Sequence, residues 1–182
     1  MNDTQNEMRA VLTGDIINSS ILDQHERQSL FEAFPKLSNT LRDLYPEEIS
    51  YNISNFRGDG WQLIINHSRK SLEISLFIRT YLRFAVTEKK IDSRIANGVG
   101  KVDFIPEGNV SAGFGSAYTV SGHLLEGLAA NQRMALGFST TRQPLINSTA
   151  TILPLYPLYK EGVVVPDRTV VEVKAGSSQG GS

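Results

Sequence analysis

The sequence ISYNISNFRGDGWQLII, residues 49–65, predicts a β-hairpin around which the rest of the chain can be arranged. Ile49, Tyr51 and Ile53 alternate with polar residues, which is the period of a strand with one buried face. Residues 61–65 form a second apolar run of strand length. The intervening RGDG has the glycine-rich composition of a tight turn. We therefore expect two antiparallel strands here.

A strand and a helix precede this hairpin. Residues 9–17 form a short, mostly apolar run that we interpret as a central strand. Between residues 23 and 45, apolar side chains recur at spacings of three and four, as in an amphipathic helix. We expect Pro35 to kink or divide this helix, because proline removes a hydrogen bond and crowds the preceding turn.

Another helix and strand follow the hairpin. Residues 68–88 carry a broad apolar stripe with one polar face, which predicts a helix. Residues 94–104 predict a strand, in which Gly98 and Gly100 indicate either a bulge or a close approach of another backbone. The chain therefore continues the alternation that began before the hairpin.

Residues 116–131 predict a further helix, with Leu124, Leu125 and Leu128 as its inner residues, and residues 133–139 predict a fifth strand. The order strand, helix, strand, strand, helix, strand is that of the split βαβ, ferredoxin-like arrangement. We thus expect an α+β fold with a βαββαβ core, extended by a C-terminal helix and at least one more strand.

The C-terminal part of the chain gives a weaker signal. Prolines interrupt the apolar residues of segment 144–160, to which we assign no role. Valines at 163–165 and 170–173 indicate a terminal pair of short strands. We expect one domain over residues 1–174 and a disordered glycine- and serine-rich tail over 175–182.

Composition limits the class of protein. The chain has 182 residues, 40% of them hydrophobic, which suits one globular core. Its formal charge of −1 leaves no broad basic field for nucleic acid or an anionic membrane. Cysteine is absent, which excludes disulfides and thiolate chemistry. With neither a signal-peptide pattern nor an apolar run of about 20 residues, we expect a cytoplasmic protein that does not enter membranes.

Two acidic residues are the strongest functional candidates. Asp15 ends the first predicted strand, and Asp59 lies in the turn that opens the third. In a ferredoxin-like sheet these strands are antiparallel neighbours, so both carboxylates should meet at one rim. With the helix entry at residues 18–20, they would form a site for divalent cations that hold a polyphosphate. Mg²⁺ or Mn²⁺ ions at a separation of roughly 3.5–4 Å would support phosphoryl transfer.

Each motif also has an ordinary structural interpretation. Gly-Asp-Gly is a common hairpin turn, and residues 14–20 could be a strand exit followed by a helix cap. The pair is more informative than either motif alone, because one fold would bring both acids together. Arg57 and Arg94 should approach the same end of the sheet and could neutralise a triphosphate, although solvated strand ends often carry arginine.

Four segments carry a family resemblance: AVLTGDIINSS, NFRGDGWQLII, RIANGVGKVDF and GFGSAYTVSGHLLE. Over about residues 9–140 the chain resembles the class III nucleotidyl cyclase catalytic domain and its small divergent bacterial relatives of the SatD type. The resemblance implies two metal ions bound by Asp15 and Asp59 with help from the carbonyl of Ile16. It also implies a homodimer with sites at the subunit interface. The phosphates would be received by the turn Ile17, Asn18, Ser19 and Ser20.

The chain departs from the family at three positions. Asn55 stands where the family has its adenine-reading lysine, so base preference is open, with a pyrimidine among the alternatives. Thr119 and His123 align with the family's transition-state asparagine and arginine. A histidine is mostly neutral near pH 7, and on a leucine-rich helix it is often a half-buried packing residue.

Two aromatic residues are further candidates for the site. Tyr118 and Phe114 could stack on a base, or they could belong to the core or to a dimer contact.

Three functions follow as alternatives. In the first, a nucleoside triphosphate is converted into a 3′,5′-cyclic nucleotide and pyrophosphate by a two-metal mechanism. In the second, a degenerate cyclase-type domain binds a nucleotide, a metal or a protein partner without turnover, as Thr119 and His123 favour. In the third, the same acids form a linear linkage, as in palm-type polymerases, which the lack of a basic composition disfavours.

Overall fold

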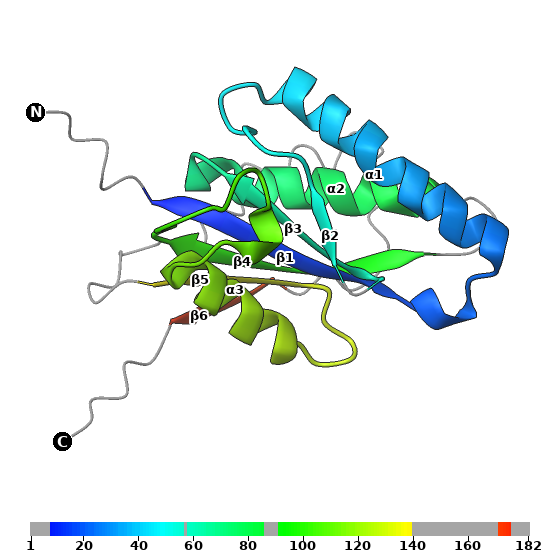
Figure 1. Cartoon of the computed structure of the whole chain (residues 1–182). Helices are drawn as coiled ribbons and strands as arrows, with labels where there is room; N and C mark the ends of the chain where they lie inside the picture. The colour runs from blue at the N-terminus through cyan, green and yellow to red at the C-terminus, as the bar shows by residue number, and fades with distance from the viewer. Residues whose placement is uncertain (1–7, 57, 86–90, 140–170, 176–182) are drawn as a thin grey trace, which may run out of the picture.

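A computed structural model describes residues 8–56, 58–85, 91–139 and 171–175. Within them, one six-stranded sheet has the order β2-β3-β1-β4-β5-β6. Helices α1 and α2 cover one face of the sheet and α3 covers the other (Figure 1). The strands are β1 (Arg9–Ile17), β2 (Ser54–Phe56), β3 (Gly60–Ile65), β4 (Asp92–Gly100), β5 (Met134–Phe138) and β6 (Val171–Ala175). The helices are α1 (Gln24–Leu44), α2 (Ser71–Ala85) and α3 (Ser116–Glu126), with 3₁₀ turns η1 (Ser19–Ile21), η2 (Ser68–Lys70) and η3 (Val110–Ala112).

The sheet confirms the predicted α+β fold. Strand β1 lies between β3 and β4 and is antiparallel to both, while β2 pairs antiparallel with β3. This is the ferredoxin-like order. Strands β5 and β6 add to β4 in parallel, with α3 as the connection from β4 to β5. Because β1 is central, the end that carries Asp15 is flanked by a strand on each side.

The first strand of the hairpin is shorter than expected, and the prediction of a strand from Ile49 was wrong. Ile49 and Ile53 are buried, as their alternation suggested, but both precede β2. Their amides bond to the α1 side instead: Ile49 N–H donates to the carbonyl of Tyr45 and Ile53 N–H to the hydroxyl of Ser38. A connection that follows the helix closely thus replaces a paired strand.

Helix α1 runs through Pro35 without being divided. A capping box fixes its start: the side chain of Asp23 accepts from Glu26 N–H, and the side chain of Glu26 accepts from Asp23 N–H. Pro35 lies on the exposed side, while Phe34 and Leu37 on either side of it are buried. Packing of the buried stripe therefore outweighs the single backbone hydrogen bond lost at proline.

Helix α3 packs on the sheet through small residues. A Cβ added at Gly98 of β4 would lie 2.2 Å from the carbonyl oxygen of Ala117 and 2.5 Å from Ser121 N. Gly98 thus permits the close backbone approach that its place in a strand predicted. The leucine-faced helix is corrected in part: Ala117 and Ser121 are the buried residues of α3, and Leu124 and Leu125 are only partly buried. Leu128 is buried as predicted, but it lies beyond the helix end.

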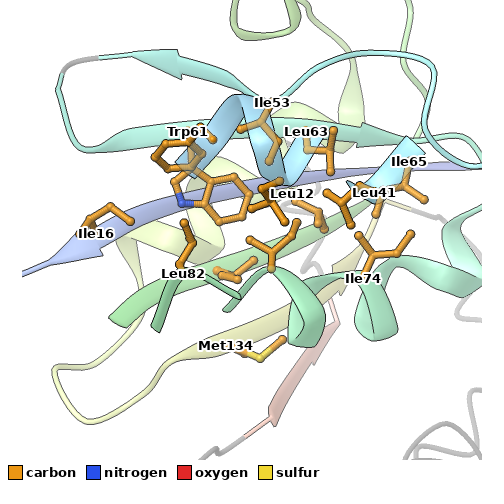
Figure 2. Packing of buried hydrophobic residues seen from close by; sticks show 14 of the residues in the cluster. Leu12, Ile16, Leu41, Ile53, Trp61, Leu63, Ile65, Ile74, Leu82 and Met134 are labelled. Atoms are coloured by element: carbon orange, nitrogen blue, oxygen red, sulfur yellow. The ribbon is translucent and has the colours of Figure 1, made fainter. Parts of the chain in front are cut away.

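The larger part of the core lies between the sheet and helices α1 and α2, where Trp61, Leu12, Leu63 and Ile74 pack together (Figure 2). The indole of Trp61 occupies the space above Gly14, where a Cβ would lie 2.4 Å from the ring. Position 14 therefore needs glycine, because any side chain would displace the largest fully buried residue of the core.

Strand β6 agrees with the expected strand at 170–173, while the predicted strand at 163–165, segment 144–160 and most of the 175–182 tail lie outside the described residues. The strand predicted over residues 94–104 ends at Gly100, the last residue of β4, and Phe104 forms only an isolated bridge with Phe114.

None of the described helices has both the length and the apolar character that crossing a bilayer requires.

Candidate functional site

Asp15 and Asp59 lie at one rim of the sheet. Asp15 is in register with Gly60, the residue directly after Asp59. Just beyond, Ile16 N–H donates to the carbonyl oxygen of Asp59 over 3.1 Å. The two acids are therefore spatial neighbours at the end of β1, although they are remote in sequence.

Arg94 is the direct partner of Asp15. It stands opposite Asp15 in the β1–β4 register, and its Nε donates to Oδ1 over 2.9 Å while Nη2 donates to Oδ2. The pKa of Arg94 is raised, chiefly by the hydrogen bond to Asp15; burial opposes the rise, and the charges of Asp15 and Asp59 add to it. One guanidinium thus lies in the field of both carboxylates, paired bidentately with one of them.

Asp59 is held by the turn that follows β1. The hydroxyl of Ser19 donates to Asp59 Oδ2 over 3.0 Å. Asn18 makes this possible by adopting a left-handed backbone, with φ 61° and ψ 25°, so that the chain turns back over the rim. Asparagine tolerates this conformation better than most residues. Of the remaining turn residues, Ile17 is half-buried and Ser20 is exposed.

Phe56 forms part of the same rim and was not identified from the sequence. Phe56, Gly60, Asp15 and Arg94 occupy successive register positions across β2, β3, β1 and β4, so they share the face that α3 covers. The ring of Phe56 lies over Gly60, where a Cβ would meet it at 2.8 Å. An aromatic ring therefore lies at this rim, over the residue that follows Asp59. The sequence could have indicated this role, because Phe56 lies only two residues before the Gly-Asp-Gly turn.

Buried hydroxyls support the backbone around Asp15. Ser93 Oγ donates to the carbonyl oxygen of Asp15 over 2.8 Å and accepts from Trp61 Nε1 over 3.1 Å. On the other face, Thr13 Oγ1 lies 2.8 Å from Ser121 Oγ and accepts from Gln62 Nε2 over 3.0 Å. These contacts tie the strand end to the core and to α3, which limits the movement of Asp15.

Several predicted site residues are not brought to this rim within one chain. Asn55 is in register with Trp61, so it lies on the opposite face from Asp15, and its side chain is exposed. Thr119 and His123 are exposed on α3, one turn apart and away from its buried residues. The half-buried packing role considered for His123 is therefore wrong. Arg57 lies outside the described residues.

The candidate stacking residues separate into two environments. The hydroxyl of Tyr118 donates to the carbonyl oxygen of Val110 over 2.7 Å, and burial, with a smaller contribution from Tyr51, raises its pKa to about 12. Tyr118 is thus a packing residue of the α3 layer. Phe114 is 57% exposed, with its ring centroid 5.7 Å from that of Phe104. No contact joins this aromatic pair to the acids among the described residues.

The residues at the rim suit a divalent cation. Mg²⁺ is commonly bound by one or two carboxylates together with substrate phosphates and water, and Asp15, Asp59 and the carbonyl of Ile16 are donors of that kind. A cationic group, the guanidinium of Arg94, already lies in this field. Among the described residues no cluster of three or more His, Cys, Asp or Glu side chains could hold a metal, so substrate oxygens would have to complete the coordination. A cation at Asp15 would also have to exchange with Arg94.

Three solved structures resemble parts of the chain. The guanylate cyclase domain of RhGC from Catenaria anguillulae, in complex with GTP, is 15% identical, with a TM-score of 0.46 over 63% of this chain and 70% of that one. The catalytic core of a rhodopsin-guanylyl cyclase with converted specificity, in complex with ATPalphaS, is 16% identical, with a TM-score of 0.46 over 63% of this chain and 70% of that one. The guanylyl cyclase Cya2 is 15% identical, with a TM-score of 0.47 over 81% of this chain and 77% of that one. No family model and no curated protein matches the chain. These likenesses are too distant to assign an activity.

Proposed function

We propose that the protein is a nucleotidyl cyclase, which converts a nucleoside triphosphate into a 3′,5′-cyclic nucleotide and pyrophosphate with two Mg²⁺ or Mn²⁺ ions. The observation that carries the proposal is the arrangement of Asp15, Asp59 and Arg94 at one rim. Two carboxylates there suit cations, and Arg94, on the strand beyond Asp15, suits phosphate oxygens. These are the two requirements of metal-assisted phosphoryl transfer.

In this proposal each residue of the rim has a distinct task. Asp15 and Asp59 hold the cations, assisted by the carbonyl of Ile16. When bound, the cations would lower the pKa of the attacking 3′-hydroxyl and stabilise the leaving pyrophosphate. Arg94, once released from Asp15, would bind phosphate oxygens in a bidentate manner. The hydroxyls of the turn after β1 would donate to the same triphosphate.

A homodimer belongs to the same proposal. Asn55, Thr119 and His123 lie away from the acid rim of their own chain. They would contribute to the reaction only if a second copy brought them over the rim of its partner. Asn55 would then meet the base with a donor and an acceptor but no charge, which leaves room for a pyrimidine.

A second candidate function is binding without turnover. It is favoured by the closed pairing of Asp15 with Arg94 and by the lack of an arginine at position 123. In this alternative the domain binds a nucleotide or a protein partner in a regulatory role. The rim then serves recognition, and its ion pair is the resting form.

The test is incubation of the full chain with each of the four ribonucleoside triphosphates and Mn²⁺, followed by mass spectrometry for cyclic product and an assay for pyrophosphate. Removing one charge-stabilising group from such a site typically costs 100-fold or more. We therefore expect Asp15→Asn and Asp59→Asn each to lower turnover roughly 100-fold. Asp43→Asn is the matched control, because Asp43 is an exposed carboxylate on α1.

The outcomes separate the two functions. Cyclic product that disappears in both rim variants but persists in Asp43→Asn supports the cyclase. Metal-dependent nucleotide binding without product, measured by calorimetry, supports the binding function instead. Absence of both nucleotide binding and product, with each of the four nucleotides, contradicts the cyclase and the nucleotide-binding form of the alternative, and leaves only the protein partner.

A further inference from the structure

Three arginines surround the carboxylate of Asp92 at the start of β4. Arg79 of α2 donates from Nε to Oδ1 and from Nη2 to Oδ2, each over 2.7 Å. Arg83, one turn further along α2, donates from Nη1 to Oδ2 over 3.3 Å. The Nε of Arg133, just before β5, lies 3.6 Å from the same oxygen. We call Arg79, Arg83, Asp92 and Arg133 the arginine cluster.

The three guanidiniums of the cluster differ in burial and in the hydrogen bonds that they donate. The side chain of Arg79 is buried, at 6% exposure, and forms the bidentate pair with Asp92. The side chains of Arg83 and Arg133 are 27% and 26% exposed. Within the described residues, the hydrogen bond to Asp92 is the only one that Arg83 makes, and Arg133 directs Nη1 to the carbonyls of Ala130 and Gln132. Both side chains are thus partly exposed, and both have guanidinium N–H groups for which no hydrogen bond is found among the described residues.

The charges of the cluster do not balance among the described residues. Asp92 is the only described carboxylate that forms an ion pair with Arg83 or with Arg133. Bringing like charges together is unfavourable in a partly desolvated place, and an anion added there would relieve the repulsion. Guanidinium forks match the oxygen geometry of a phosphate group, and hydrogen bonds between two charged groups are the stronger kind.

We propose that the arginine cluster binds an oxyanion of the phosphate class, with Arg83 and Arg133 as its direct ligands. Asp92 holds Arg79 in place and orients the other two arginines. The cluster lies at the same end of β4 as the candidate acid rim, since Asp92 is in register with Ile17 and Arg94 with Asp15. It is nevertheless a separate site, with its own arginines. The proposal does not depend on the cyclase activity.

The experiment is calorimetric titration of the metal-free full chain with inorganic phosphate and, separately, with pyrophosphate, at constant ionic strength and with chloride as the reference anion. We expect binding to the wild type and at least a tenfold loss of affinity in the Arg83→Gln/Arg133→Gln double variant. Arg42→Gln/Arg69→Gln is the matched control, because it removes two exposed arginines elsewhere and changes the net charge equally. Arg94→Gln tests whether the anion binds at the acid rim instead.

Each outcome bears on the proposal. Absence of phosphate and pyrophosphate binding by the wild type would overturn it, as would equal affinity in the cluster and control double variants. A loss confined to Arg94→Gln would move the anion to the acid rim and also overturn it. If the double variant unfolds, Arg133→Lys keeps the charge but not the fork, and an affinity between those of wild type and the single variant Arg133→Gln would support the proposal. Neither metal nor nucleotide is present, so a cyclase failure leaves this result unaffected.

Discussion

The acid rim and the arginine cluster both contain an arginine–aspartate ion pair, but the ratio of arginine to aspartate differs between them. At the rim, one guanidinium, that of Arg94, lies in the field of the carboxylates of Asp15 and Asp59. In the cluster, three guanidiniums surround the carboxylate of Asp92. Among the described residues, the rim has more acidic than basic side chains, which favours a cation, and the cluster has more basic than acidic ones, which favours an anion. The balance of charges, more than the presence of an ion pair, therefore indicates what each place can bind.

The two places also differ in burial. The side chains of Arg79 and Asp92 are 6% and 16% exposed, whereas those of Arg94 and Asp15 are 33% and 24% exposed. Breaking a buried pair leaves an uncompensated charge, while a more solvated pair exchanges partners at lower cost. We infer that Asp92 mainly fastens α2 to the sheet and that Asp15 is the acid whose partner can be exchanged.

The largest expected effect comes from Asp92→Asn. This variant leaves buried Arg79 without its carboxylate and three guanidiniums close together, and removing one partner of such a pair costs about 3 kcal/mol. Urea unfolding followed by circular dichroism would measure the loss. Asp15→Asn should cost about 1 kcal/mol or less, because the pair is partly exposed and the charge of Asp59 still acts on Arg94. Equal losses in the two variants would contradict the distinction by burial.

A smaller effect is expected from Arg94→Gln at the rim. The variant removes the guanidinium that competes with a cation for Asp15, so Mn²⁺ should bind about tenfold more tightly, equivalent to about 1.4 kcal/mol. Electron paramagnetic resonance of free Mn²⁺ would measure the affinity, without nucleotide. Arg42→Gln controls for the change in net charge. Unchanged or weaker Mn²⁺ binding in Arg94→Gln would mean that the acids do not share a cation site.

The smallest effect concerns salt. In double-mutant cycles, the coupling of Asp15 with Arg94 should fall by a few tenths of a kcal/mol when NaCl is raised from about 0.05 to 0.5 M, because ions screen exposed pairs. The coupling of Asp92 with Arg79 should change less, because that pair is more buried. Thermal or urea unfolding of the four variants in each cycle supplies the values. A stronger salt response at Asp92 would reverse the comparison.

Local patterns predicted much of the chain correctly. The apolar run of β1, the helical stripes of α1 and α2 and the turn before β3 depend on neighbours in sequence, so their periods were visible without coordinates. Ile49 and Ile53 show the limit of such patterns. Alternation reported their burial correctly, but a strand also needs a partner for its amides, and these amides bond to Tyr45 and Ser38.

The candidate site divides in the same way. The expected antiparallel order was enough to bring Asp15 and Asp59 to one rim, because topology fixes which strand ends meet. It did not predict that Arg94 would pair directly with Asp15, nor that Asn55 would lie on the other face. Those facts depend on register, and a shift of one residue turns every side chain of a strand to the opposite face.

The sequence by itself determined the order of the elements, the central strand and the two acidic turns, since each is encoded in residues that are close along the chain. Only the tertiary structure decided which charges meet. Arg94 and Asp15 come from different strands, and Asp92 is joined by arginines from α2 and from the approach to β5. Such pairings arise when strands and helices separated in sequence pack together, and hydrophobic periodicity carries no record of them.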